Sequence, residues 1–434
     1  MKSFFKKIIV ALLEIEAKAV LKKYHPNIVA ITGSVGKTTT KDAIYSVLAE
    51  HFFVRKSDKS FNSEIGVPLT ILGLPNVWSN PVLWLRNLFD GLLLVLFPHP
   101  YPQWLVLEVG ADRPGDIERV MQWIHPDISV VTRLSKVPVH VEFFDSPEAV
   151  RREKSFLVRG VKPTGTVILN ADDEDVRAFA SLTKARAVMY GMDSTADVRC
   201  ADYQVMYEHN VPVGVQYVVQ KGDERATVQI HGSLGMQHVY TTLAGCAVAA
   251  ALNLPLAQAA AALADHDSPP GRMRILRGLR GSVLIDDTYN SSPVAAQQAL
   301  KTLGDVTPAE GGRRIAVLGD MLELGEFSAG EHRLLGERAA SVADLILTVG
   351  IRARGAAEEA LNAGLSREQV VSFDDAVSAG EFLAKEIRTG DVVLLKGSQG
   401  VRLEKAVAQI LSPEVTPEER AELLVRQDEE WQKR

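Results

Sequence analysis

The chain has 434 residues, of which 46% are hydrophobic and 24% charged, so it is long enough for two to three globular domains with proper cores. Its formal net charge of −6, without a basic cluster, argues against a nucleic-acid partner. The two cysteines, Cys200 and Cys246, lie far apart and have no ligand-like neighbours. This disfavours a disulfide framework or a zinc site and favours a reducing compartment, which we take to be the cytoplasm.

Residues 1–25 are predicted to form an amphipathic helix that precedes the first domain. Their apolar residues recur at helical spacing, whereas Glu14, Glu16 and Lys18 interrupt the apolar run. No small-residue cleavage site follows, so the segment does not match a secretory signal. We interpret it as a packed or interfacial helix.

The strongest signal in the sequence is the stretch 28–40, IVAITGSVGKTTT. A β-branched run stops at Gly33 and a helical pattern begins after Thr38, which predicts a strand, a glycine loop and a helix in that order. Backbone N–H groups in such a loop bind phosphate oxygens, and the helix N-terminus adds partial positive charge. Lys37 would reach the outer phosphates and the Thr38 hydroxyl would hold magnesium. The predicted nucleotide-binding residues are Gly33, Ser34, Val35, Gly36, Lys37, Thr38 and Thr39.

Residues 78–101 are unusually apolar and contain only two charged side chains, Arg86 and Asp90. The stretch is too short and too interrupted to span a bilayer. Two interpretations stay open: a buried helix, which its length favours, and a helix in peripheral contact with a membrane surface.

The remaining pattern predicts an α/β fold. Strand-like runs at 104–109, 128–132 and 166–169 alternate with helical stretches, as in a mostly parallel sheet with helices on both faces. Alternation between residues 205 and 230 indicates a small antiparallel meander, and an alanine-rich helix follows over 240–252. These elements form a phosphate-loop central domain, predicted to span residues 26–268.

Turn-forming residues at 267–271 mark the best domain boundary. Beyond it, residues 269–412 are predicted to form a Rossmann-like α/β domain, with strands at 283–286, 314–318, 345–349 and 392–395. Residues 413–434 are predicted to form a charged, solvated helical tail that starts at a capping box of Thr416 and Glu419. It would pack on the surface through Leu423 and Leu424.

Several polar residues follow predicted strands. Glu108 ends a strand beside the phosphate loop, so it is placed to hold magnesium next to Thr38. His140 also lies near a strand end, although a lone histidine is more often structural. Lys154 lies in a charged run whose default interpretation is a solvated helix face. Residues 286–290 place two carboxylates and an asparagine at a strand end that would face the nucleotide across a cleft.

Together these stretches resemble the Mur ligase family, ATP-dependent enzymes that build the peptide of bacterial cell-wall precursors. The resemblance runs from about residue 26 to residue 411 and is closest to the branch that adds D-alanyl-D-alanine to a muramyl-tripeptide. The matching motifs are TGSVGKTT at 32–39, NSEIGVP at 62–68, LEVGA at 107–111, DDTYN at 286–290, LGDMLELG at 318–325 and KGS at 396–398.

The resemblance implies a carboxylate–amine ligase that works through an acyl phosphate, uses ATP and two magnesium ions, and acts on a muramyl-peptide and D-alanyl-D-alanine. We also expect the protein to be a monomer. The implied catalytic residues are Lys37, Glu108, His140 and Lys154. The implied metal ligands are Thr38, Glu108, His140 and Lys154, the last as a carbamate. Further nucleotide contacts are implied for His238, Arg272, Asp287 and Asn290. The implied substrate-binding residues are Asn62, Asp320, Glu323, Lys396 and Ser398.

The sequence also departs from the pattern of that branch. Only a short helix precedes the phosphate loop, where the branch carries a domain that binds the UDP-sugar. His238, Ser292 and Gln399 stand where the family pattern has Asn, Asn and often Arg. We therefore expect retained ATP chemistry with altered substrate recognition. A different peptide or a lipid-linked acceptor stays open, as do a non-ligating nucleotide-binding protein and, more weakly, a simple NTPase.

Overall fold

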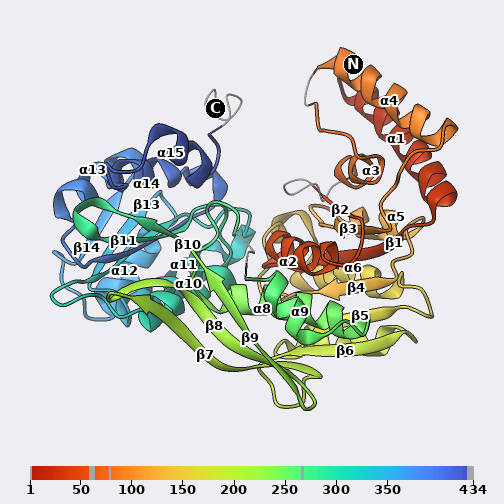
Figure 1. Cartoon of the computed structure of the whole chain (residues 1–434). Coiled ribbons are helices and arrows are strands. Elements are labelled where there is room, and N and C mark those ends of the chain that lie inside the picture. The colour runs from red at the N-terminus through yellow and green to blue at the C-terminus, as the bar shows by residue number, and fades with distance from the viewer. Residues whose placement is uncertain (1, 58–63, 78–79, 265–267, 428–434) are drawn as a thin grey trace.

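The computed structural model describes residues 2–57, 64–77, 80–264 and 268–427, and for residues 2–7 the backbone alone. Figure 1 shows two α/β units beside each other, with a pair of long helices, α1 (Lys2–Tyr24) and α4 (Pro81–Leu96), at the outer edge of the first unit. The predicted α/β class is confirmed. The exact domain limits at 25, 268 and 412 stay predictions.

The first unit is built on a nine-stranded sheet with the order β2-β3-β1-β4-β5-β6-β7-β8-β9. Strands β2 to β7 run parallel, and β7 to β9 form the predicted antiparallel meander, which extends the same sheet. The strands are β1 (Asn27–Thr32), β2 (Val54–Lys56), β3 (Trp104–Glu108), β4 (Ile128–Val131), β5 (Thr166–Asn170), β6 (Arg186–Gly191), β7 (Val198–Glu208), β8 (Val211–Lys221) and β9 (Glu224–His231).

Strand β1 shows how this sheet acquires two covered faces. Val29 and Ile31 pack into one hydrophobic cluster, and Ile28 and Ala30 pack into another, because successive side chains of a strand point to opposite faces. The helices that supply the cover are α2 (Lys37–Ala49), α3 (Gly66–Leu72), α5 (Asp116–Met121), α6 (Pro147–Arg159), α7 (Glu174–Ala178), α8 (Met236–Ala251) and α9 (Leu256–Ala262), with short 3₁₀ turns η1 (Val141–Phe143) and η2 (Phe179–Leu182).

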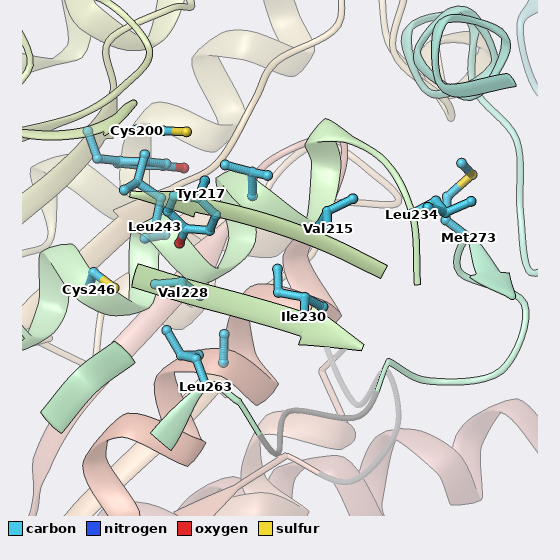
Figure 2. Close-up of a cluster of buried hydrophobic side chains, with 14 of the residues drawn as sticks. Cys200, Val215, Tyr217, Val228, Ile230, Leu234, Leu243, Cys246, Leu263 and Met273 are labelled. Carbon is cyan, nitrogen blue, oxygen red and sulfur yellow. The ribbon is translucent and has the colours of Figure 1, made fainter. Parts of the chain in front are cut away.

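The core beneath the meander reaches the start of the second unit. Figure 2 shows side chains of β8 and β9 facing α8, with Leu234 next to Met273 on the segment that leads into the second unit. Inside this core the Tyr217 hydroxyl lies 2.9 Å from Thr242 Oγ1, so the buried phenol keeps a hydrogen-bond partner. The two units are therefore packed together where the chain crosses between them.

The second unit is a six-stranded sheet with the order β10-β11-β15-β12-β13-β14, in which only β10 is antiparallel. Its strands are β10 (Arg274–Arg277), β11 (Val283–Asp287), β12 (Arg314–Gly319), β13 (Leu345–Val349), β14 (Val370–Phe373) and β15 (Val392–Lys396). Its helices are α10 (Pro293–Asp305), α11 (Ser328–Ala340), α12 (Arg354–Asn362), α13 (Ala376–Glu386), α14 (Glu404–Ile410) and α15 (Pro417–Leu423), with 3₁₀ turns η3 (Leu279–Gly281), η4 (Gly325–Phe327) and η5 (Gln399–Val401).

The C-terminal tail is only partly as predicted. The capping box is present, since Thr416 Oγ1 accepts a hydrogen bond from Glu419 N at 3.2 Å and Glu419 Oε2 accepts one from Thr416 N at 2.9 Å. However, α15 ends at Leu423, and both Leu424 and Val425 are buried. The packing of Leu424 agrees with the prediction, but residues 424–427 do not continue the helix. Residues 428–434 lie outside the described part.

Within the apolar stretch 78–101, residues Pro81–Leu96 form the half-buried helix α4, so the favoured interpretation of a buried helix is correct for one side only. Asn80 caps it by accepting hydrogen bonds from the N–H groups of Val82 and Leu83. At its other end Lys23 Nζ of α1 donates to the carbonyl groups of Leu94, Val95 and Phe97 at 2.6–3.0 Å. Among the described residues, no helix is long and apolar enough to cross a bilayer.

Between α1 and α4 lies a half-buried carboxylate, that of Glu16, which yields a testable prediction. Glu16 Oε2 has no hydrogen-bond partner, and burial raises the pKa of Glu16 to about 7. The unfolded chain therefore loses this proton at a lower pH than the folded chain, so stability falls as the pH rises from about 4.5 towards 7. We expect Glu16→Gln to raise the free energy of unfolding by on the order of 1 kcal/mol at pH 8 and to have little effect at pH 4.5.

The measurement is denaturant unfolding of both proteins at the two pH values. Glu14→Gln is the matched control, since Glu14 pairs with Lys18 at 2.5 Å on the outside of the same helix. An equal gain at both pH values would show that the carboxylate of Glu16 is not the cause.

Candidate active site

The phosphate loop connects β1 to α2 as predicted. Gly33 has φ 148°, and a Cβ atom there would lie 1.9 Å from Thr132 Oγ1. Gly36 has φ 82° and immediately precedes α2, so a left-handed residue turns the chain into the helix. These two glycines fix the loop at the carboxyl end of β1, where the N-terminus of α2 faces a pocket.

Two lysines meet at one carbonyl group of this loop. Lys37 Nζ donates to Gly33 O at 3.0 Å, and Lys154 Nζ donates to the same oxygen at 3.1 Å. Burial lowers the pKa of Lys37, and it lowers the pKa of Lys154 to about 7, with the nearby positive charge of Lys37 as the next cause. The default interpretation of Lys154 as part of a solvated face is therefore wrong.

Helix α6 buries Lys154 together with the acid that precedes it, Glu153. The Glu153 carboxylate accepts hydrogen bonds from the N–H groups of Gly115, Ile117 and Glu118 at 2.7–3.1 Å. It thereby satisfies the N-terminus of α5 and holds α6 in place.

Thr38 and Glu108 meet beside the loop, as predicted from their adjacent strands. Thr38 Oγ1 donates to Glu108 Oε2 at 2.9 Å, and Glu108 is 1% exposed. Arg272 Nη2 donates to Thr38 Oγ1 at 3.2 Å from the segment that leads into the second unit. A hydroxyl and a carboxylate oxygen next to a phosphate site are a donor set that suits Mg²⁺. In the described part of the chain, no three His, Cys, Asp or Glu side chains gather as a ready-made metal cluster.

His140 lines the same pocket but already contacts the second unit. Its Nδ1 lies 2.7 Å from Glu323 Oε2, and its Nε2 lies 3.6 Å from Asp112 Oδ1. His140 and Glu323 both have positive φ, 66° and 63°, at the loops that carry η1 and η4. The predicted metal ligand and the predicted substrate residue therefore face each other across the two units.

The opposite wall of the pocket comes from the second unit. Asp287 and Lys396 are register partners at the ends of β11 and β15, and Lys396 Nζ lies 2.7 Å from Asp287 Oδ2 and donates to Asn290 O at 3.0 Å. The pocket encloses about 260 Å³. Its lining residues are Ser34, Val35, Gly36, Lys37, Thr38, Thr39, Glu108, Val139, His140, Gln237, His238, Thr241, Arg272, Asp287, Tyr289, Asn290, Ser291, Ser292, Ala295, Gln298, Lys396 and Gln399.

Some residues of the implied substrate side lie elsewhere. Asp320 Oδ1 accepts a hydrogen bond from Ala353 N at 2.7 Å, and Ser398 Oγ accepts one from Leu322 N at 2.9 Å. Both side chains are buried and hold loops of the second unit, and neither lines the pocket. Asn62 lies outside the described residues.

His238 lines the pocket, but its two ring nitrogens contact protein groups. Nε2 lies 2.9 Å from Arg272 O and Nδ1 lies 3.1 Å from Ser268 Oγ, and the residue is 1% exposed. The ring therefore ties α8 to the connecting segment, and a nucleotide contact by His238 stays a prediction.

Tyr289 and Arg426 were missed by the sequence reasoning. The Tyr289 ring has Arg272 at 4.2 Å and Arg426 at 5.9 Å from its centroid, and it lines the pocket. Arg426 Nη2 donates to Tyr289 O at 2.5 Å, and Arg426 Nη1 lies 2.8 Å from Glu404 Oε2. The C-terminal tail therefore fixes the loop that forms one wall of the site. The sequence around Arg426 contains no motif or periodicity that predicts its contact with Tyr289.

This contact yields a second prediction. Arg426→Ala should raise the KM for ATP by about tenfold or more while kcat changes less, because a loosened Tyr289 loop weakens binding before it affects chemistry. Arg426→Lys should recover only part of the loss, since the guanidinium makes several directed hydrogen bonds. Steady-state kinetics is the measurement, and the exposed Arg367→Ala is the control. A fall in kcat without a change in KM would contradict this positioning role.

A phosphate loop facing a second α/β unit across a polar pocket defines a two-domain ATP-using enzyme. Residues 31–82 and 92–249 match the Mur ligase middle domain, and residues 271–399 match the Mur ligase, glutamate ligase domain. The UDP-N-acetylmuramoyl-tripeptide–D-alanyl-D-alanine ligase of Mycobacterium tuberculosis (strain CDC 1551 / Oshkosh) is 31% identical over 404 residues, which cover 88% of this chain and 72% of the relative. The chain belongs to the Mur ligase family.

Further comparisons agree with this assignment. The ligase of the same name from Bacillus subtilis (strain 168) is 27% identical over 398 residues, covering 91% of this chain and 78% of the relative. The crystal structure of MurF ligase from Thermotoga maritima in complex with ADP has a TM-score of 0.75 and 26% identity, covering 96% of this chain and 84% of that chain. The predicted family and its two α/β domains are thereby confirmed.

Proposed function

We propose that this protein is an ATP-dependent, ADP-forming ligase that joins the carboxylate of a muramyl-tripeptide precursor to the amine of D-alanyl-D-alanine. The observation that carries the proposal is the meeting of Lys37, Lys154 and the Thr38–Glu108 pair at the phosphate loop, opposite Asp287 of the second unit. The names of the relatives in M. tuberculosis and B. subtilis support the choice of substrates. Plain nucleotide binding would not require a second buried lysine at the same carbonyl.

In the first step, a substrate carboxylate oxygen attacks the γ-phosphorus of ATP while the bond to the β,γ-bridging oxygen breaks and ADP leaves. Lys37 and the N–H groups at the start of α2 offset the negative charge of the phosphoryl group. In the second step, the amine nitrogen attacks the acyl carbon, the carbon–oxygen bond to phosphate breaks, and the nitrogen loses a proton. The products are an amide, ADP and phosphate.

Thr38 and Glu108 would hold magnesium, and His140 and Lys154 would complete a pair of metal sites. Bound Mg²⁺ would neutralise charge on the phosphate oxygens. We further propose that Lys154 works as a carbamate: its amine adds to CO₂ and loses a proton, which turns a cation into a carboxylate. Its burial beside Lys37 supports this change, because two ammonium groups on one carbonyl repel each other.

We place the enzyme in the cytoplasm as a monomer. This placement agrees with Cys200 and Cys246, which are both free and buried, as expected where thiols stay reduced.

The test is phosphate release from ATP with magnesium, in the presence of UDP-muramyl-tripeptide and D-alanyl-D-alanine, added singly and together. Release that requires both substrates is the expected result. Release with a lipid-linked or shorter peptide acceptor only would keep the chemistry and change the acceptor. ATP binding without release for any acceptor would overturn the proposal in favour of a non-ligating nucleotide-binding protein.

A further inference from the structure

The pair of helices α1 and α4 concentrates exposed apolar side chains. Among the side chains that the structure describes, seventeen large hydrophobic ones are exposed, and ten of these belong to α1, α4 or the residue after α4. The two helices lie side by side at the outer edge of the first unit, away from the second unit (Figure 1). The active-site pocket contains no residue of either helix. The surface therefore has no part in the site described above.

On α4 the exposed residues form one continuous stripe. Val82, Leu85, Phe89, Leu92 and Leu96 are spaced by three and four residues, so they share one face of the helix, and they are between 44% and 71% exposed. The opposite face packs inward through the buried residues Trp84, Asn87 and Gly91. On α1, Ile8, Leu12 and Ile15 are likewise exposed and follow the same spacing, whereas Leu13, Ala17 and Val20 are buried. Each helix thus has a packed face and an unpartnered apolar face.

The residues beside the α4 stripe argue against a helical protein partner. In a coiled coil the positions that flank the apolar seam carry charges that set the partner and its register. Here those positions are Arg86, Leu88, Leu93 and Val95. The sole ion pair recorded on the described part of α4 is Arg86 with Asp90, at 3.6 Å. A lipid phase needs no complementary charged seam, so this composition favours a membrane over a second helix.

The net positive charge of the α1 segment favours binding to an anionic surface. Residues 1–24 contain six lysines and two glutamates, a net charge of +4, whereas the whole chain has a net charge of −6. The rest of the protein is therefore strongly acidic and would be repelled by anionic lipid, while the α1 segment would be attracted to it. Exposed Lys22 accompanies the apolar face of α1, and Lys18 beside it pairs with Glu14.

We propose that the exposed faces of α1 and α4 form a docking surface for an anionic lipid bilayer, with the α4 stripe in the boundary between headgroups and acyl chains. Both helices would lie along the surface and neither would cross it. The proposal is independent of the ligase reaction, because it rests on residues outside the pocket. It would hold the catalytic units next to a membrane while leaving the pocket open to water.

The test is flotation of the full chain with vesicles of phosphatidylcholine alone and of phosphatidylcholine with phosphatidylglycerol. We expect binding to the mixed vesicles and at least about tenfold weaker binding to the neutral ones. Raising the salt from about 50 mM to about 500 mM should abolish binding, because salt screens the attraction between the lysines and the anionic lipid. The triple variant Leu85→Glu, Phe89→Glu and Leu92→Glu should bind at least tenfold more weakly, because it places charges in the apolar stripe.

The matched control is Leu334→Glu, Ile351→Glu and Val377→Glu, three exposed apolar residues of the second unit, which should bind vesicles as the unaltered protein does. Thermal unfolding and ATP binding of both variants establish that they fold. Absence of binding to the mixed, anionic vesicles would overturn the proposal, and so would equal binding by the stripe variant and the unaltered protein. So would analytical ultracentrifugation showing a dimer that the stripe variant abolishes, since the occupant would then be a second copy of this chain.

Discussion

Lys154→Ala is expected to lower kcat by at least about 10³-fold, equivalent to about 4 kcal/mol of lost transition-state stabilisation, while ATP binding changes by less than about tenfold. The reason is geometric: Lys154 is 5% exposed and its Nζ shares the Gly33 carbonyl with Lys37. In the proposed mechanism, a group enclosed at that point would act on the phosphates or their metal ions. The measurement is single-turnover phosphate release, with ATP binding followed separately by calorimetry.

Different substitutions of Lys154 tell whether turnover needs a positive ammonium or a negative carbamate at this position. Lys154→Arg keeps a cation, so it should stay inactive if a carbamate is required and should retain activity if an ammonium is required. Short carboxylic acids added to Lys154→Ala should restore part of the turnover in the carbamate case. Lys162→Ala is the control, because Lys162 is half-exposed, lies outside the pocket and pairs with Asp127 at 2.7 Å. Full activity of Lys154→Ala would remove this lysine from the mechanism.

Asp287→Ala is expected to lower the free energy of unfolding by about 3–5 kcal/mol, because it leaves the Lys396 ammonium buried without its carboxylate. Lys396 has a side chain that is 2% exposed, and Asp287 is its ion-pair partner at 2.7 Å. Turnover should fall as well, since both residues line the pocket. Chemical denaturation measures the first effect and phosphate release the second.

A double variant separates the two effects. Asp287→Ala with Lys396→Met removes both charges, so it should regain part of the stability without regaining turnover. Asp305→Ala is the matched control: its pair with Lys301 is largely exposed and should contribute no more than about 1 kcal/mol. A double variant less stable than Asp287→Ala alone would show that the unpaired charge is not the cause.

The parallel strands were predictable from the sequence because they are short apolar runs, buried on both faces and bounded by turn residues. Leu345–Val349 has the predicted limits, and Trp104–Glu108 ends one residue before its predicted limit. The meeting of Thr38 and Glu108 was predictable for the same reason, since neighbouring parallel strands end at one edge of the sheet. The hydrophobic pattern of the strands and their order in the sheet are therefore enough to predict the part of the site that the first unit provides.

Residues whose role depends on packing between distant segments were not predictable in this way. The charged run around Lys154 resembles a solvated helix face, but Glu153 and Lys154 are buried, with Glu153 bonded to the N-terminus of α5 and Lys154 to the phosphate loop. The contact of His140 with Glu323 requires knowledge of how the two units face each other. Arg426 reaches the pocket wall from the chain end, where no periodicity or motif points to it.

The cross-unit contacts have a consequence for ATP affinity itself. Because the pocket takes its walls from both units, only molecules in which they face each other bind ATP with full strength. The apparent dissociation constant then equals the intrinsic one divided by the fraction of such molecules. His140–Glu323 and Arg272–Thr38 raise that fraction, so they contribute to affinity even where they do not touch the nucleotide. Replacing Glu323, which does not line the pocket, would thus weaken ATP binding with every nucleotide contact intact.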